Sequence, residues 1–319
     1  MKAIYDVAAP AKLNLFLHIT GRRADGYHLL QSVFMLIDWC DTLHFERRGD
    51  GQISREDLRP TAAQTPPANR PPAEVLPADD LCIRAARALQ LHLPTGHAGK
   101  KLGVHIGLAK NIPTQAGMGG GSSDAASTLL ALNRLWNCQL ALPTLMEIGL
   151  QLGADVPFFL QGHNAWVEGI GDKITPIQLP PARFVVAKPP DGLETAKIFA
   201  HPDLPRASAN AIISGFVARS ESGEDSAESG LFEFGRNDLQ VVAQNLSPGV
   251  RQGLEWLKLL GLNGRMTGTG SAVFAKAGSA VTSEAVPEDR AAHISNVPPG
   301  FSARVCNNLP QHPLLDWAG

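Results

Sequence analysis

Residues 113–124 read Pro-Thr-Gln-Ala-Gly-Met-Gly-Gly-Gly-Ser-Ser-Asp, and this glycine-rich segment has the chemistry of an anion site. Without Cβ atoms, Gly117, Gly119, Gly120 and Gly121 let the backbone approach a bulky ligand and turn its N–H groups toward it. The flanking residues alternate as a strand does up to Leu108 and recur at helical spacing from Ala125. A glycine loop that opens a helix favours a phosphate. A flexible linker is the alternative, and the patterned flanks argue against it.

The spacing within the loop excludes two common phosphate-binding motifs. A Walker A loop needs Lys and then Ser or Thr after its last glycine, whereas Ser122 and Ser123 follow Gly121. The dinucleotide pattern G-x-G-x-x-G fails because Ser122 stands where the last glycine belongs. We expect Ser122, Ser123 or Asp124 to cap the helix.

A carboxylate and an amine supply candidates for proton transfer. Asp155 stands in Gly-Ala-Asp-Val-Pro, among apolar neighbours just past a predicted helix. Transfer of a phosphoryl group to an alcohol needs a group that accepts the hydroxyl proton, and Asp155 is the candidate base. Lys12 can pair with Asp155, keep it ionised and polarise the acceptor oxygen. The plainer interpretations are a turn or cap residue for Asp155 and a surface lysine for Lys12.

Length and composition indicate a soluble enzyme of two domains. The chain has 319 residues, 44% of them hydrophobic, and a net charge of −2. No basic excess points to nucleic acid or to an anionic membrane. We find no run of about eighteen apolar residues and no leader at Met1, so we expect a cytoplasmic protein without a membrane segment. The four scattered cysteines lack a C-x-x-C pair, which favours reduced thiols.

The elements arrive in clusters, which favours an α+β architecture rather than regular βαβ units. Strands are predicted at 8–18, 32–37, 42–46, 164–167, 184–187 and 272–275, and helices at 81–91, 123–136, 142–152, 210–218, 238–244 and 250–260. Asp79 and Asp80 are capping candidates for the first helix, and Gly153 closes the third. Along the first strand Leu13, Leu15 and Leu17 share one face, and Lys12 and Asn14 share the other.

The predicted domains are 1–163 and 164–319. Residues 50–76 are charged and then rich in proline, and we expect a mobile insertion there. Residues 220–229 are acidic and rich in serine, and we expect a solvated loop there.

The motif P-x-x-x-G-[LM]-G-G-G-S-S resembles the ATP loop of the GHMP kinases, a family named after galactokinase, homoserine, mevalonate and phosphomevalonate kinases. Further segments resemble the branch of this family whose acceptor is a cytidine diphosphate sugar alcohol of the non-mevalonate isoprenoid pathway. These matching segments are residues 9–15 (APAKLNL), 23–28 (RADGYH), 153–158 (GADVPF), 169–172 (GIGD), 198–199 (IF), 237–239 (NDL) and 266–271 (MTGTGS).

The resemblance implies a two-domain GHMP kinase fold with an N-terminal nucleotide-binding domain, a C-terminal α/β domain and an active site in the cleft between them. It implies that the γ-phosphoryl group of ATP is transferred to the 2-hydroxyl of the erythritol unit. Asp155 is then the base, with Lys12 as its partner. The implied substrate-binding residues are Asn14, Tyr27, His28, Thr195 and Phe199.

Tyr27 and Phe199 would sandwich the cytosine ring, with His28 at its polar edge. Taken singly, each of these three has a plainer interpretation as a turn, core or strand-end residue. Thr195 would touch the phosphates of the substrate.

On the nucleotide side the resemblance implies contacts from Lys110, Pro113, Ala116, Gly117, Met118, Gly119, Gly120, Gly121, Ser122, Ser123, Asp124 and Asp80. The family commonly has asparagine where this chain has Asp80 and often where it has Asp124. As a carboxylate, Asp80 could accept only from the adenine amino group. A second glycine turn, Gly268-Thr269-Gly270, is expected on the substrate side of the phosphates. Mg²⁺ is expected with ATP, carried mainly by the phosphates with Ser123 or another hydroxyl nearby, and no metal carboxylate is identified.

Two other functions compete with this one. A kinase of the same family for homoserine or mevalonate would not need Tyr27, His28 and Phe199, because those acceptors have no base to stack. A non-catalytic binding protein on the same fold would not need Lys12, Asp155 and an unbroken glycine loop. We expect small-molecule partners, no nucleic acid and no obligate protein partner.

Overall fold

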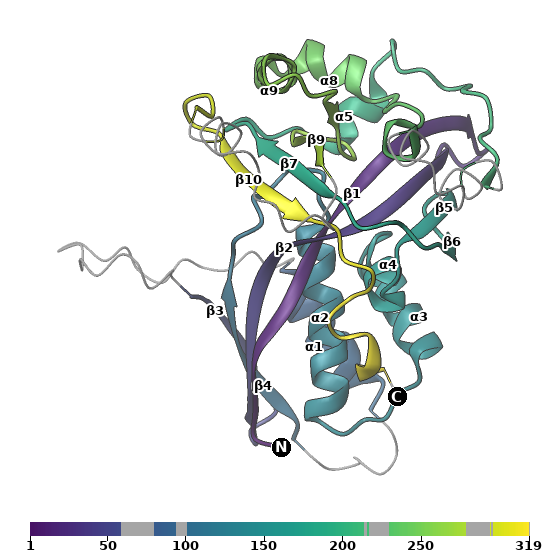
Figure 1. Cartoon of the computed structure of the whole chain (residues 1–319). Coiled ribbons are helices and arrows are strands. Elements are labelled where there is room, and N and C mark those ends of the chain that lie inside the picture. Colours follow the sequence, from purple (N-terminus) through teal and green to yellow (C-terminus); the bar gives the residue numbers. More distant parts are fainter. Residues whose placement is uncertain are drawn as a thin grey trace.

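Two β-sheets stack on each other with helices on their outer faces (Figure 1). The computed structural model describes residues 1–58, 80–93, 101–213, 216, 230–278, 294 and 296–318. One sheet has six strands and the other has four. The α+β, two-domain GHMP kinase architecture expected from the sequence is confirmed.

The larger sheet is built around two long antiparallel strands, β1 (Ala3–Arg22) and β2 (His28–Arg48). β4 (Gly103–Ala109) pairs with one end of β2 and β5 (Ala165–Gly169) with the other, and β3 (Ile53–Asp57) and β6 (Lys173–Pro176) form the outer strands on these two sides. The two predicted strands at 32–37 and 42–46 are one strand. The pairing shifts register between Pro10 and Ala11, opposite the predicted break, so a bulge rather than a turn interrupts the pattern.

Four helices cover one face of this sheet: α1 (Leu81–Leu91), α2 (Gly120–Leu135), α3 (Leu142–Leu152) and α4 (Val156–Gln161). The bounds of α1 and α3 are those predicted. The carboxylate of Asp80 caps α1 by accepting the Ile83 N–H at 3.0 Å. The predictions for α2 need correction, because the helix starts at Gly120 and its N-cap is Gly119, with no side-chain cap. Ser122, Ser123 and Asp124 therefore lie inside the helix.

The second sheet has the order β10-β7-β9-β8, with β7 (Arg183–Lys188), β8 (Arg265–Met266), β9 (Val273–Gly278) and β10 (Ser302–Asn307). Alternate residues of β7 face opposite layers. Phe184 and Val186 pack toward Leu13 and Met35 of the larger sheet. Val185 and Ala187 belong to a separate core with residues of α5 (Thr195–Ala200), α8 (Gln240–Leu246) and α9 (Pro248–Leu259). A 3₁₀ turn, η2 (Leu315–Trp317), ends the described chain.

Two boundaries of the predicted organisation change. The predicted insertion at 50–76 begins inside the fold, because residues 53–57 form β3, which pairs in parallel with β4. The predicted division at 163/164 separates β5 and β6 from the sheet to which they belong. By sheet membership, we propose a division between Pro176 and Arg183. Residues 59–79, the loop at 220–229 and much of the predicted helix at 210–218 lie outside the described residues.

Candidate active site

The glycine segment connects β4 to α2 and wraps the start of that helix. Gly117 and Gly119 adopt left-handed conformations, with φ of 71° and 69°, which residues with side chains rarely tolerate. The first turn of α2 leaves backbone N–H groups without helical partners, and the helix dipole adds positive charge there. This end of the helix can hold an anion.

The second glycine turn meets the first through backbone contacts. The Ser271 N–H donates to the Gln115 carbonyl at 3.2 Å, and the Ala272 N–H donates to the Ala116 carbonyl at 3.1 Å. Gly268 and Gly270 also have positive φ, 53° and 82°. The turn is held from the other side, because the Asn237 amide donates to the carbonyls of Met266 and Gly268 at 2.9 and 2.8 Å. The two glycine turns, one from each half of the chain, therefore lie against each other and both line the same cavity.

Lys12 and Asp155 form an ion pair beside these turns, with Nζ 3.7 Å from Oδ2. Lys12 is buried, its Nζ donates to Asn14 Oδ1 at 2.5 Å, and it lies 4.5 Å from the centroid of the Phe34 ring. Burial lowers the pKa of Lys12, and Asp155 opposes that shift. Asp155 occupies the N-cap position of α4, yet its side chain makes no capping hydrogen bond. Its carboxylate is one-third exposed and open to a substrate.

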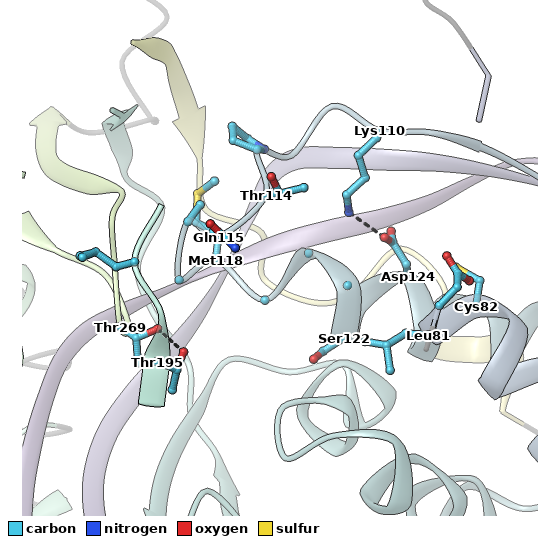
Figure 2. Close-up of a pocket in the computed structure, with 18 of the residues that line it drawn as sticks. Leu81, Cys82, Lys110, Thr114, Gln115, Met118, Ser122, Asp124, Thr195 and Thr269 are labelled. Carbon is cyan, nitrogen blue, oxygen red and sulfur yellow. Dashed lines mark hydrogen bonds and ion pairs between the residues drawn. The ribbon is translucent and has the colours of Figure 1, made fainter. Parts of the chain in front are cut away.

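Two cavities meet beside the two glycine turns and the Lys12–Asp155 pair. The first, of about 1120 Å³, is lined by the glycine segment together with Asp80, Lys110 and Asp124 (Figure 2). The second has a volume of about 760 Å³, and its lining includes Lys12, Asn14 and Asp155. Both are lined by Gly117, Gly119, Thr195 and Thr269. The hydroxyls of Thr195 and Thr269 lie 3.1 Å apart at this junction, where α5 meets the second glycine turn (Figure 2).

Comparison with known proteins decides the family. The chain is 60% identical to "4-diphosphocytidyl-2-C-methyl-D-erythritol kinase" of Variovorax paradoxus (strain S110), with 100% of both chains covered, and 59% identical to the protein of the same name from Albidiferax ferrireducens, with 100% of this chain and 96% of the relative covered. The chain belongs to the 4-diphosphocytidyl-2-C-methyl-D-erythritol kinase family. It is therefore a kinase, and ATP is the phosphoryl donor that its fold implies.

Domain models and solved structures agree with membership in this kinase family. The model for the GHMP kinases N terminal domain matches residues 80–163, and that for GHMP kinases C terminal matches 221–292. A crystal structure of 4-(cytidine 5'-diphospho)-2C-methyl-D-erythritol kinase superposes with a TM-score of 0.70 at 30% identity, covering 94% of this chain and 98% of that one. Homoserine kinase from Cytophaga hutchinsonii has a TM-score of 0.64 at 14% identity, with coverage of 98% and 96%, and shares the fold.

In this kinase, most of the residues predicted to bind ATP line the first cavity. They are Asp80, Lys110, Pro113, Ala116, Gly117, Met118, Gly119, Gly120, Gly121, Ser122 and Asp124. Ser123 is absent from both cavity walls because α2 starts earlier than predicted, and its hydroxyl is buried without a hydrogen-bond partner among the described residues. The serine of this pair that lines the cavity is Ser122, whose side chain faces it (Figure 2).

Lys110 belongs to a buried charge cluster that sequence reasoning did not find. Its Nζ lies 2.5 Å from Asp41 Oδ2 and 2.7 Å from Asp124 Oδ2. Asp41 also accepts the N–H groups of Asn111 and Ile112, at 2.5 and 2.7 Å. Burial, with the charge of Asp41 nearby, raises the pKa of Asp124 to about 7, against the opposing effect of Lys110. Asp41 thus fixes the lysine beside the first turn of α2.

The residues predicted to hold the cytosine line the second cavity. Tyr27 is 63% exposed at the mouth. The rings of His28 and Phe199 stack with centroids 5.2 Å apart and planes 27° apart. His28 therefore covers one side of Phe199, and the sandwich of the cytosine between Tyr27 and Phe199 stays a prediction. Burial lowers the pKa of His28, which favours a neutral ring.

Three further observations concern membrane spans, metal binding and a residue that holds the second glycine turn. None of the helices among the described residues is long and apolar enough to cross a membrane. Within the same part of the chain no three His, Cys, Asp or Glu side chains gather where one metal ion could be held. Sequence reasoning also missed Thr267, whose hydroxyl accepts the Asn14 backbone N–H at 2.8 Å and ties the second glycine turn to β1.

Proposed function

We propose that this kinase transfers the γ-phosphoryl group of ATP to the 2-hydroxyl of 4-diphosphocytidyl-2-C-methyl-D-erythritol, giving the 2-phosphate and ADP in the non-mevalonate isoprenoid pathway. The observation that carries the proposal is the junction of the two cavities at Gly117, Gly119, Thr195 and Thr269. A donor in the first cavity and an acceptor in the second can meet there, next to Asp155 and Lys12. Holding the two reactants in line supplies much of the rate enhancement in phosphoryl transfer.

Each residue near the junction has a role in the proposed reaction. Asp155 accepts the proton of the 2-hydroxyl while the hydroxyl oxygen bonds to the γ-phosphorus. The bond from that phosphorus to the β,γ-bridging oxygen breaks, which releases ADP. Lys12 lies against Asp155 and stabilises the negative charge that develops on the transferring group. The amides at the start of α2 hold phosphate oxygens. Asn14 and Thr195 orient the acceptor.

Magnesium enters this proposal with ATP rather than as a resident metal. The Ser122 hydroxyl lines the first cavity, and the acidic residues of its wall, Asp57, Asp80, Asp124 and Glu194, form no cluster of three that could hold a metal among the described residues, which fits an ion carried mainly by phosphates. The proposal also keeps the expectations of a cytoplasmic location and of no obligate protein partner.

Support for a cytidine acceptor comes from the aromatic wall of the second cavity. Tyr27, His28 and Phe199 line it, and stacking on aromatic side chains is the usual way to hold a base. Homoserine or mevalonate would leave this wall without a partner. The intact Lys12–Asp155 pair argues against a non-catalytic binding protein.

A coupled assay of ADP release tests the proposal. The cytidyl substrate, homoserine and mevalonate are compared at equal concentration, and ³¹P NMR identifies the product. We expect turnover with the cytidyl substrate alone and a new phosphomonoester signal at the 2-position. Turnover with homoserine or mevalonate in its place would overturn the substrate assignment, and no turnover with any acceptor would favour a binding protein.

A further inference from the structure

Arg22 is a cationic side chain on the wall of the acceptor cavity that the proposed reaction does not use. The charged residues of that wall are Lys12, Arg22, Asp25 and Asp155. Lys12 is already bonded to Asn14 and paired with Asp155. Among the described residues no carboxylate lies within ion-pair distance of Arg22, whereas its neighbour Arg23 is paired with Asp25 at 2.6 Å.

The fold holds the guanidinium of Arg22 at the end of the cavity where the aromatic residues lie. Arg22 is the last residue of β1 and stands opposite His28 in the β1–β2 pairing. Its Nε donates to the Gly26 carbonyl at 2.9 Å, and Nη2 lies against Gly26, 3.4 Å from the position of a Cβ there. One edge of the guanidinium is therefore fixed to the turn, while no described acceptor binds the Nη groups.

A second arginine near this end has its donors engaged. Arg206 donates to the carbonyls of His201, Pro202 and Leu204 at 2.7, 3.2 and 3.2 Å. The charges of Arg206 and Arg22 both lower the pKa of His28, after the larger effect of burial, so both cations lie near that ring. Since Asp25 is paired with Arg23, this end of the cavity carries excess positive charge.

An anion between the base and the alcohol would complement that charge. We propose that Arg22 binds the diphosphate group of the acceptor through its Nη atoms and selects a nucleoside diphosphate over an uncharged nucleoside. The inference rests on the proposed function, because the acceptor must place its base at Tyr27 and its hydroxyl at Asp155. The planar guanidinium matches two phosphate oxygens, and such charge-assisted contacts are stronger than neutral ones.

Binding measurements separate this role from a structural one. CDP and cytidine are titrated into the wild-type protein, Arg22→Gln, Arg22→Lys and the matched control Arg23→Gln by calorimetry. We expect Arg22→Gln to weaken CDP about tenfold, since exposed charge-assisted contacts to the phosphate oxygens are lost, and to leave cytidine within twofold. Arg22→Lys, which keeps the charge, should restore part of the CDP affinity, and Arg23→Gln should change neither ligand.

Each other outcome overturns the inference in a distinguishable way. Equal losses for CDP and cytidine would mean that Arg22 acts only by holding the turn at Gly26. Unchanged CDP affinity in Arg22→Gln would remove Arg22 from recognition and leave the proposed function intact. No binding of CDP or cytidine to the wild-type protein would overturn the cytidine acceptor itself and Arg22 with it.

Discussion

Replacing Asp155 by asparagine keeps the shape of the side chain and removes its charge, so it separates a catalytic role from a structural one. The side chain makes no capping bond at the start of α4, so the helix loses no cap. What the substitution removes is the electrostatic attraction between the Asp155 carboxylate and Lys12 Nζ, which lie 3.7 Å apart. At this distance the attraction is about 1 kcal/mol in water and about 4 kcal/mol near a protein surface. Since Asp155 is one-third exposed, the lower part of that range applies.

We therefore expect a small stability change and a large activity change for Asp155→Asn. A loss of about 1 kcal/mol lowers the Tm by roughly 1–2 °C in a chain of 319 residues. Removing the group that accepts the hydroxyl proton should lower kcat by about 10²- to 10⁴-fold with little change in the acceptor KM. The pKa of Lys12 should also fall further, because Asp155 now holds it up against burial.

The assay is steady-state ADP release together with single-turnover phosphorylation of the cytidyl substrate, which separates chemistry from product release. Glu255→Gln, an exposed acid on α9 away from both cavities, is the matched control and should have normal kcat. A kcat for Asp155→Asn within about fivefold of the wild type in both assays would refute the reasoning that makes Asp155 the base.

Three further predictions address the rings that stack on the cytosine, the insertion at 50–76, and the charge cluster of Asp41, Lys110 and Asp124. Tyr27→Ala or Phe199→Ala should raise the KM for the cytidyl substrate roughly ten- to a hundredfold, from about 1–3 kcal/mol of stacking, with the ATP KM within a few-fold; kinetics that show weakened ATP instead would assign the rings to adenine. Replacing residues 64–72 by a short Gly/Ser linker should leave Tm and kcat nearly unchanged, because loop length costs little, and a collapse of Tm would contradict this. Because the pKa of Asp124 is raised to about 7 in the folded state, the folded protein retains a proton that the unfolded chain releases above about pH 4, so stability falls as pH rises through that window. Asp124→Asn should flatten this fall in melting curves from pH 5 to 8, and parallel curves for the two proteins would contradict the raised pKa.

Local patterns in the sequence predicted the elements that their own residues determine. The helices at 81–91 and 142–152 have the predicted bounds because apolar spacing defines their length. Asp80 marks the start of the first helix and Gly153 marks the end of the second. The predicted start of α2 was wrong because serine is a common N-cap residue, and the prediction relied on that preference. In the structure Gly119 adopts a left-handed conformation and the helix begins at the next residue. A preference of residue type gave way to a backbone conformation that glycine favours.

Features that depend on pairing between distant segments could not be predicted from one sequence. β3 has the residues Ile-Ser-Arg-Glu-Asp, with little apolar alternation, and it exists because β4 offers a parallel partner. Asp41 and Lys110 are 69 positions apart, and only the pairing of Thr42 with Ala109 brings them together. Without that register no spacing rule connects the two charges.

The glycines of the loop take on a further meaning from what surrounds them. A Cβ on Gly117 would overlap the carbonyl oxygen of Thr267 in the second glycine turn. A Cβ on Gly119 would lie 3.0 Å from the ring of Phe159 and 3.3 Å from Cγ of Lys12. These two positions therefore need glycine because protein packs against them, and not only because a ligand must approach.

This close packing links the two halves of the chain to the chemistry. Lys12 donates its backbone N–H to the Met118 carbonyl at 2.9 Å, in the segment between the two glycines. Any shift of the second glycine turn would press on Gly117 and be transmitted along the loop toward Lys12. The donor loop, the turn of the second domain and the candidate catalytic lysine thus contact one another directly, which suits a reaction that depends on alignment more than on reactive side chains.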